Sequence, residues 1–481
     1  MYYKSLSIYK YLALFAIILA AGCKAYKPIE PQTNSPMPAS FNANADTLTA
    51  AALPVNTFFK DAFLLKLIDT ALKANLDLRA ALQRVEMAGA NVKYNKSLLL
   101  PSVEFNATAG LERYGDYTMN GVGNYDTNLS PNVNGDKRIP NPTPDYFIGF
   151  RSSWEIDLWG KLRSQKNAAL ARFLASRSAY RLLTTELTAQ IATAYYELLA
   201  LEVEQNIINK NIKLQENALE IVKVQKLGGR ATELAVQQFA AQLSHTKSLK
   251  YSTAQQITET ENQLRLLTGT FDAPIARDTS LLTLNMPEKL GTGIPSQMLL
   301  NRPDIKQAEL ELAALNADIK SARAAFFPSL TLSPYVGYNS FRAALLFDPG
   351  SAVYGLIGGL TAPLLNRGRI KADYAYKIAQ GKEALYNYQK TVLAGYQEVM
   401  NNLKGMENYS QYFTHKQQQV TALKNAVDVA NDLYVVGRAT YLEVITAQRD
   451  VLDAELELAN TKKNIFITDV NLYRALGGGW R

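Results

Sequence analysis

The chain has 481 residues but only one cysteine, Cys23, and two histidines, His245 and His415. A single cysteine excludes an internal disulfide. Each histidine lies in an amphipathic stretch of helical pattern without carboxylates at metal-ligand spacing, so we expect neither to bind a metal. The chain also lacks a Gly-rich loop between a strand and a helix, the pattern that holds phosphate groups. These shortages argue against an enzyme and predict no metal and no cofactor apart from a covalent lipid discussed below.

Long apolar runs are equally scarce. One run, Tyr11–Ala21, follows Lys4 and Lys10 and ends at Gly22 and Cys23. It is too short for a permanent membrane span, and its basic start is typical of an export signal. No other segment approaches the roughly 18 consecutive apolar residues of a transmembrane helix. We therefore predict a signal peptide over residues 1–22 and no helical membrane span in the mature chain.

The segment "AAGC", which ends at Cys23, resembles the bacterial lipobox, in which the cysteine receives a lipid and becomes the mature N-terminus. A leucine is usual three residues before that cysteine, and here the residue is Ala20, with Leu19 one position earlier. The alternative is an ordinary signal peptide with a chance cysteine. Residues 23–60 begin with a stretch rich in Pro, Ser, Asn and Thr, which predicts an extended tether between the lipid and a folded body.

The chain carries no strong excess of one charge. The formal net charge of +8 is modest for this length, and Lys, Arg, Asp and Glu are interspersed along helical patterns. This distribution is typical of solvated helix faces, so we expect no nucleic-acid partner.

Proline is absent between Gly160 and Lys226. One heptad register fits this stretch, and most of its seam positions are apolar, which predicts coiled-coil packing. The seam comprises Tyr180, Leu187, Ala194, Leu201, Ile208, Gln215 and Val222, alternating with Thr184, Ile191, Leu198, Gln205, Ile212 and Leu219. A helix of this length reaches roughly 100 Å, which no compact globular domain requires.

The tetrapeptide "GRAT" occurs twice, at Gly229–Thr232 and at Gly437–Thr440, an offset of 208 residues. The same offset aligns Gly160 with Gly368, and an offset of 227 aligns the segments that end at Pro101 and Pro328. The chain is therefore a tandem duplication. We place one repeat at 61–268 and the other at 301–477, with a linker at 269–300. The change of offset puts extra residues in the first copy, in a long loop between Pro101 and Gly160.

Each "GRAT" lies where a long helical pattern ends and a second one begins. A glycine can take the left-handed conformation that ends a helix, and Thr232 or Thr440 can cap the next helix. We therefore expect two helical hairpins. In each repeat the shorter helical segments, before Pro101 and after Ala231 in the first copy, together approach the length of the long helix, so we expect them to stack end to end beside it.

Four segments alternate apolar and polar residues with a period of two, at about 102–113, 146–157, 329–339 and 353–364. Strands of about ten residues with one apolar face are typical of transmembrane β-barrels. Four strands cannot close such a barrel, and an open edge in lipid would leave backbone groups without partners. We therefore expect a mixed fold of α-helices and transmembrane β-strands, in which several chains share one barrel.

Three motifs carry a resemblance to a family: "SSWEIDLWGKLR", "NRPDIKQAELELAALNADIKSARAAFFPSLTL" and "YVVGRATYLEVITAQRDVLDAELEL". They resemble the TolC-like outer membrane factors, especially the lipoprotein branch that works with resistance-nodulation-division (RND) efflux pumps. The resemblance covers nearly the whole mature chain. It implies a homotrimer with a shared 12-stranded β-barrel in the outer membrane and a long coiled-coil α-helical barrel in the periplasm. It also implies a periplasmic adaptor and an inner-membrane pump as partners, and passive efflux of small molecules to the exterior.

The resemblance also implies a periplasmic gate near the second "GRAT". Glu443 matches an acidic position of the family's closed mouth, Thr446 stands where many members have a second acid, and Tyr434 matches a tyrosine that ties the tip. The residues themselves allow two simpler roles: Thr440 and Glu443 fit a capping box, and Tyr434 suits a helix core. For adaptor docking we single out the tip residues Gly229, Arg230, Gly437 and Arg438, although the arginines also suit a solvated turn.

Two other functions fit part of the pattern. A type I secretion channel for proteins would have the same tunnel, although the lipobox and the "RPDI" block favour the efflux branch. A non-conducting structural lipoprotein would need the helices but not the four amphipathic strands. The substrate and the cognate pump cannot be read from the residues.

Overall fold

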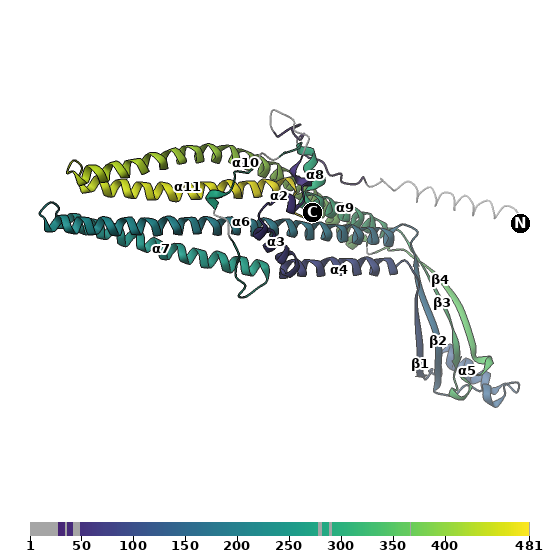
Figure 1. Ribbon diagram of the computed structural model, residues 1–481. Coiled ribbons are helices and arrows are strands. Elements are labelled where there is room, and N and C mark those ends of the chain that lie inside the picture. The colour runs from purple at the N-terminus through teal and green to yellow at the C-terminus, as the bar shows by residue number, and fades with distance from the viewer. Residues whose placement is uncertain are drawn as a thin grey trace. The chain divides into compact units, whose positions relative to one another are not determined.

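A computed structural model describes residues 27–33, 36–41, 49–277, 281–287, 291–365 and 367–480. The predicted signal peptide and Cys23 lie outside the described residues. The protein combines long helices with one antiparallel sheet (Figure 1). The described residues divide into two compact units, one within 27–30, 89–171 and 312–385 and the other within 31–88, 172–311 and 386–480.

In chain order the α-helices and strands are α2 (Val55–Phe58), α3 (Ala62–Ala74), α4 (Leu76–Ser97), β1 (Ser102–Glu112), α5 (Met119–Leu129), β2 (Thr143–Ile156), α6 (Lys161–Leu227), α7 (Glu233–Thr268), α8 (Met298–Asn301), α9 (Pro303–Ala324), β3 (Ser329–Ser340), β4 (Ala352–Thr361), α10 (Arg367–Val435) and α11 (Tyr441–Leu476). Short 3₁₀ turns occupy Ala50–Ala52, Gly135–Lys137, Leu281–Thr283, Pro295–Gln297, Ala343–Leu345 and Pro349–Ser351.

The first unit contains the sheet, an antiparallel meander in the order β1-β2-β3-β4. The register pairs Phe105 with Phe150, Phe150 with Val336, and Val336 with Tyr354, so these four side chains share one face. Apart from Ser152 and Ser340, this face is largely apolar, as the alternation predicts: Val103, Phe105, Ala107, Ala109 and Leu111; Tyr146, Ile148, Phe150, Trp154 and Ile156; Leu330, Leu332, Val336 and Tyr338; Tyr354, Leu356 and Leu360.

The expected long loop between β1 and β2 contains a helix of its own, α5. The Thr118 hydroxyl caps its start by accepting from the Gly121 N–H at 3.1 Å. The Asn128 side chain then fastens α5 to the returning chain, because it both donates to and accepts from the backbone of Ile139 at 2.9 Å. The composition of this segment predicted only a loop, because it does not reveal specific contacts such as the Thr118 cap and the Asn128 amide bonds.

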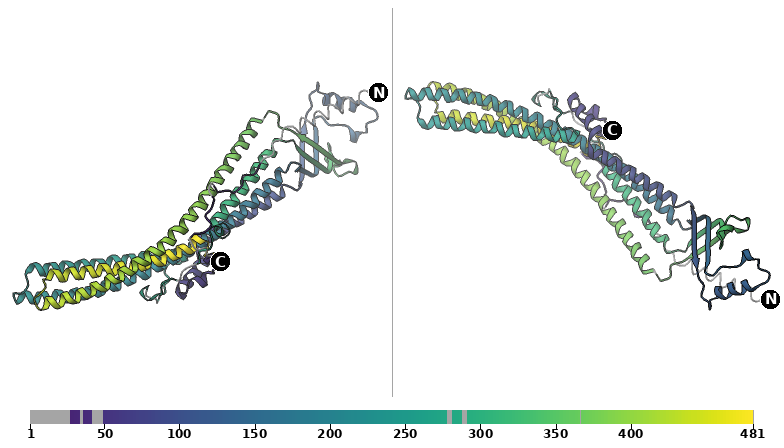
Figure 2. Two further views of the ribbon diagram at one scale, coloured as in Figure 1. Left: turned by 90° about the horizontal axis from the view of Figure 1, so that it is seen from above. Right: turned by 90° about the horizontal axis from the view of Figure 1, so that it is seen from below.

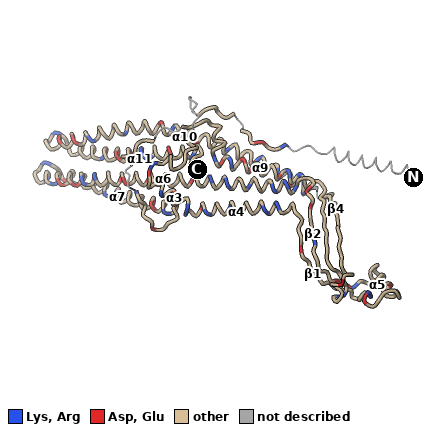
Figure 3. The backbone as a smooth tube through the Cα atoms, turned by 45° about the vertical axis from the view of Figure 1, so that its right-hand side comes forward, with Lys and Arg blue, Asp and Glu red and all other residues tan. Residues whose placement is uncertain are grey.

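In the second unit, which contains most of α6 and α10 and all of α7 and α11, the long helices form two hairpins, α6 with α7 and α10 with α11, which Figure 2 shows side by side. With 67 and 69 residues, α6 and α10 each extend roughly 100 Å. Basic and acidic residues are both distributed along their length (Figure 3). Ion pairs within each hairpin include Lys247–Glu216 at 2.8 Å and Lys424–Glu455 at 2.7 Å.

Short helices meet end to end, as the repeat predicts, and both copies use the same contacts. The Asn75 side chain donates to the Leu267 carbonyl at 2.9 Å, and Arg302 donates to the Ala475 carbonyl at 2.7 Å. Glycines end the returning helices in the left-handed conformation, Gly269 with φ 67° and Gly477 with φ 100°. A Cβ on Gly477 would lie 2.7 Å from the Asn301 carbonyl, so the tight junction requires glycine.

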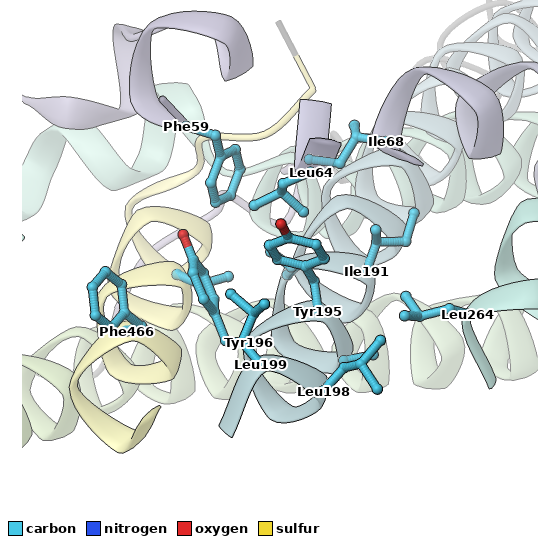
Figure 4. Packing of buried hydrophobic residues seen from close by; sticks show 14 of the residues in the cluster. Phe59, Leu64, Ile68, Ile191, Tyr195, Tyr196, Leu198, Leu199, Leu264 and Phe466 are labelled. Atoms are coloured by element: carbon cyan, nitrogen blue, oxygen red, sulfur yellow. The ribbon is translucent and has the colours of Figure 1, made fainter. Parts of the chain in front are cut away.

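The largest apolar core surrounds α6 where α3, α7 and α11 contact it (Figure 4). Tyr195 and Leu198 are fully buried there, with Leu64 of α3 and Leu264 of α7. The Tyr195 hydroxyl donates to Asp61 Oδ2 at 2.7 Å, while Asp61 Oδ1 caps α3. A buried hydroxyl thus has its partner, as burial of a polar group requires.

Candidate functional site: the hairpin tips

The two "GRAT" segments form the turns of the two hairpins, with the same backbone geometry. In the first, the Gly229 N–H donates to the Lys226 carbonyl at 3.0 Å and the Arg230 N–H to the Gln225 carbonyl at 2.8 Å. In the second, the equivalent bonds run from Gly437 to Tyr434 at 3.1 Å and from Arg438 to Leu433 at 2.8 Å. This is the Schellman pattern, and φ of 71° and 75° explains both glycines.

Threonine caps the outgoing helix of each hairpin in a different way. Thr232 Oγ1 accepts from the Ala235 N–H at 3.2 Å. At the second tip the Thr440 N–H and hydroxyl both donate to Glu443 Oε2, at 2.6 and 3.0 Å. Glu443 is exposed, and these bonds from the Thr440 backbone and side chain hold the pKa of Glu443 below its usual value. Glu443 therefore occupies the capping position that the sequence allowed, and its charge persists into mild acid.

Tyr434 and Thr446 lie on either side of this cap. Tyr434 is half-buried at the end of α10 and packs against an apolar cluster, which raises the pKa of its hydroxyl through loss of solvent. Thr446 is half-buried one turn beyond Glu443. The structure thus brings Tyr434, Glu443 and Thr446 to one hairpin end.

The apolar cluster joins both hairpins and forms what we call the tip core. It contains Ile208, Ile212, Leu219 and Val222 of α6, Ala235, Phe239 and Leu243 of α7, and Val444 of α11, with Tyr434 and Tyr441 packed against it. The two tips of one chain therefore lie against each other, and Gly229, Arg230, Gly437 and Arg438 are all exposed at their ends.

Exposed apolar side chains flank both turns, and sequence reasoning missed them. Leu227 is 88 % exposed and Leu234 59 %, while Val435 is 67 % exposed and Leu442 56 %. The 208-residue offset relates Leu227 to Val435 and Leu234 to Leu442. The repeat alignment could have identified them, because an apolar residue at the end of a helix in both copies is not explained by the turn itself.

The tips differ in what links the two helices of each hairpin. Lys226 of α6 forms an ion pair with Glu233 of α7, which also accepts from Gln237 at 2.7 Å. The equivalent positions in the second tip are Tyr434 and Tyr441, and both contact the tip core. The first tip is therefore closed by an exposed charge pair and the second by half-buried aromatic packing.

The described residues contain no group of three or more His, Cys, Asp or Glu side chains that could hold a metal ion. Among the helices of the described ranges, none is both long enough and apolar enough to cross a membrane.

The chain resembles known proteins along almost its whole length. The family model described as outer membrane efflux protein matches residues 67–270 and 294–478. The solvent efflux pump outer membrane protein SrpC of Pseudomonas putida is 29% identical, with 98% of each chain covered. The probable outer membrane lipoprotein SilC of Salmonella typhimurium is 29% identical over 98% of this chain and 99% of its own. The open-state MtrE outer membrane channel of Neisseria gonorrhoeae is 26% identical, with a TM-score of 0.81 and coverage of 95% and 98%.

Proposed function

The chain belongs to the outer membrane efflux protein family, and we propose that three copies of it form the exit duct of a tripartite exporter. As a member, it is an efflux channel of the outer membrane, a transport role rather than a catalytic one. Conduction through such a duct is passive, so an inner-membrane pump of the RND type supplies the energy and a periplasmic adaptor joins the two.

The structure of the sheet is the main support for the proposed trimer. One face is apolar apart from Ser152 and Ser340, and within the described residues β1 and β4 each pair with a neighbour on one side only. Strand edges are not tolerated in lipid, because each unpaired backbone group costs several kcal/mol there. Pairing β1 of one copy with β4 of the next closes a barrel of three times four strands, within the size range of membrane barrels.

The hairpin tips supply the proposed docking surface for the adaptor. Leu227, Leu234, Val435 and Leu442 are apolar and exposed, and Arg230 and Arg438 stand beside them at the turns. Apolar anchors beside arginine donors are typical of the central part of protein interfaces. Because both tips repeat the arrangement, one chain offers two similar sites to adaptor molecules.

Glu443 is the proposed gate residue. Three copies would place three carboxylates around the periplasmic mouth, and the lowered pKa keeps them charged. A carboxylate ring favours cations and resists leakage of anions. Capping and gating are compatible, since the exposed carboxylate keeps its charge while it accepts from Thr440. Tyr434 and Thr446 complete the proposed gate.

The proposed membrane anchor is a lipid on Cys23. Export would remove residues 1–22, and the acylated cysteine would hold the N-terminus in the outer membrane. The likeness to SilC, which is named as a probable outer membrane lipoprotein, supports this anchor.

The efflux role is favoured over the two alternatives. A non-conducting lipoprotein would have no use for a sheet with an apolar face and two open edges. The relatives give no support for a type I protein secretion channel, and SrpC is named for solvent efflux. For this chain we propose small molecules as the substrate class.

The mass of the detergent-extracted protein tests the assembly, together with the intact mass of the denatured chain. We expect three copies, each beginning at Cys23 with added acyl mass, and stepwise conductance in planar bilayers. Extraction as a monomer without detergent would contradict the shared barrel and with it the channel. A trimer that begins elsewhere in the chain would contradict only the anchor.

A further inference from the structure

One basic side chain stands on the face of the sheet opposite the apolar face. Arg151 of β2 is the only lysine or arginine in the four strands, and it is exposed. Its register partners are Glu104 of β1 and Tyr335 of β3. Because the apolar face meets lipid in the proposed barrel, this face lines the lumen, and three copies of the chain place three arginines there. An ionisable side chain at membrane depth is typical of a functional position.

The guanidinium of Arg151 lies over the ring of Phe147, 4.6 Å from the ring centroid. Phe147 is four residues earlier on the same face, and Gly149 between them has no side chain that would separate the two groups. Phe147 is buried, and a cation is held more firmly over a ring that is shielded from water. Among the described residues Arg151 forms no ion pair with Glu104 and donates no side-chain hydrogen bond, so its N–H groups remain available.

The two acids of β2 are engaged with other groups. Asp145 Oδ1 accepts from the Asn339 side chain at 2.6 Å, and Glu155 forms an ion pair with Lys161 at 2.5 Å. Arg151 therefore carries a positive charge that neither carboxylate of its own strand contacts. That charge can attract an anion on this face of the sheet.

A cavity of about 450 Å³ opens beside Arg151. The ladder between β2 and β3 is interrupted at Pro334, which has no N–H to donate. The Tyr335 ring lies over β4, where Gly355 leaves room for it, since a Cβ on Gly355 would be 2.4 Å from the ring. The cavity is lined by Arg151, Ser152, Ser333, Pro334, Tyr335 and Ile357. Its volume lies within the range of small-molecule sites.

The lining combines a guanidinium with apolar surface. A guanidinium binds a carboxylate through two parallel N–H···O bonds, with a planar geometry that lysine cannot offer. Tyr335 and Ile357 offer an aromatic and an aliphatic surface against which a flat ring can pack. A planar aromatic carboxylate fits both parts of the cavity, whereas Arg151 repels an aromatic cation.

We propose that Arg151 and Tyr335 form a binding site for planar aromatic carboxylates in the lumen of the barrel, one site per chain. The site rests on the proposed function and deepens it, because it names a class of solute that the duct binds before release. Arg151 has the opposite charge to the proposed Glu443 gate, so an anion that has passed the gate meets an attractive group. Binding must be weak for a solute to leave again, and water in the open lumen keeps it weak by competing for the carboxylate.

Ion currents of the purified trimer in planar bilayers test the site, with benzoate as the probe. We expect benzoate to reduce the single-channel current of the wild-type protein reversibly. Acetate lacks the ring and benzylammonium lacks the negative charge, so both should reduce the current far less. Arg151→Met keeps the length of the side chain and removes its charge, and it should weaken the apparent affinity for benzoate by about tenfold or more. Tyr335→Leu should weaken benzoate and leave acetate unchanged.

Arg113→Met is the matched control, because it removes an exposed arginine just beyond the end of β1 and should alter none of these currents. Arg151→Gln serves as a second neutral variant. An unchanged benzoate effect in both Arg151 variants would overturn the site, and equal effects of benzoate and benzylammonium on the wild type would overturn the solute class.

If the wild-type protein does not conduct, the proposed duct fails, and a binding measurement still decides the site. The fluorine NMR signal of 4-fluorobenzoate is then followed during titration with detergent-solubilised wild type and Arg151→Met. We expect a shift or broadening with the wild type that is largely lost in the variant. Equal changes with the two proteins would overturn the site.

Discussion

Individual buried charges in this protein are held by several partners at once, and Arg302 shows the consequence. The residue is 8 % exposed, and its guanidinium donates to Asp304 at 2.7 Å, to Glu398 at 3.0 Å and to the Ala475 carbonyl at 2.7 Å. Removing one partner of a buried ionic group leaves the others uncompensated, which costs roughly 3–5 kcal/mol.

We therefore expect Arg302→Met to lower the thermal midpoint of the detergent-solubilised protein substantially, by an amount that corresponds to about 3 kcal/mol or more. Arg84→Met, at an exposed position of α4, should shift it by less than about 0.5 kcal/mol. Equal midpoints for the two variants would show that the network around Arg302 contributes nothing to stability.

A second residue-scale prediction concerns the charge of Glu443. Because the Thr440 bonds lower its pKa, the folded protein binds this proton less readily than the unfolded chain. The stabilisation is present above the ordinary glutamate pKa of about 4.3 and is lost as pH falls through the lowered folded value. We expect the cation preference of the channel to stay constant from neutral pH to about pH 4.3 and to decline below it.

Glu443→Gln should abolish that preference at every pH, as the ratio of cation to anion permeability in planar bilayers would report. An unchanged ratio in Glu443→Gln would restrict Glu443 to its capping role.

At the scale of elements, the hairpin turns depend on backbone conformation rather than on contacts. Gly437 has φ 75°, and a Cβ there would meet nothing within 4 Å. Its requirement for glycine is therefore conformational, since a left-handed residue other than glycine costs roughly 1–2 kcal/mol. Gly228, one residue before the equivalent turn glycine, has no such φ, and a Cβ there would make only ordinary contacts.

We expect Gly437→Ala to accelerate hydrogen exchange at the ends of α10 and α11 by about tenfold, while Gly228→Ala leaves the end of α6 unchanged or slightly more protected. Similar effects at both positions would mean that chain flexibility, and not the left-handed turn, sets the stability of the tips.

At the scale of the whole molecule, the membrane should distinguish the two faces of the sheet. Leu356 and Ile357 are neighbours in β4 with similar exposure, 69 % and 61 %, but they point to opposite faces. Leu356 shares the apolar face with Val336 and Phe150, whereas Ile357 lies opposite Ser333 on the other face.

Leu356→Arg should reduce the amount of folded trimer in the outer membrane, because an arginine facing lipid at mid-depth costs about 2–4 kcal/mol. Ile357→Arg should be tolerated and should change conductance instead. The amount of folded trimer in each variant can be measured from the heat-modifiable trimer band on gels. Equal loss in both variants would contradict the assignment of the apolar face to lipid.

Much of the architecture was predictable because it depends on local periodicity. The long helices, the hairpins with their glycine turns, the end-to-end helix junctions and the apolar strand face follow from repeats of 3.5 and 2.0 residues and from the duplication. Those patterns act between near neighbours, so the residues alone express them. The helix α5 escaped prediction because its Thr118 cap and Asn128 contacts are specific to one loop.

What the sequence determined by itself is therefore the set of elements, their order and the two equivalent tips. Tertiary packing decided how each hairpin turns toward the core. Ala235 and Glu443 are equivalent in the repeat, yet Ala235 is fully buried and Glu443 is exposed, with Val444 buried in its place. A one-residue step rotates a helix face by about 100°, and only contact with the other three helices selects among such rotations. The same selection buries Gln215 and leaves Leu227 and Leu442 exposed at the tips.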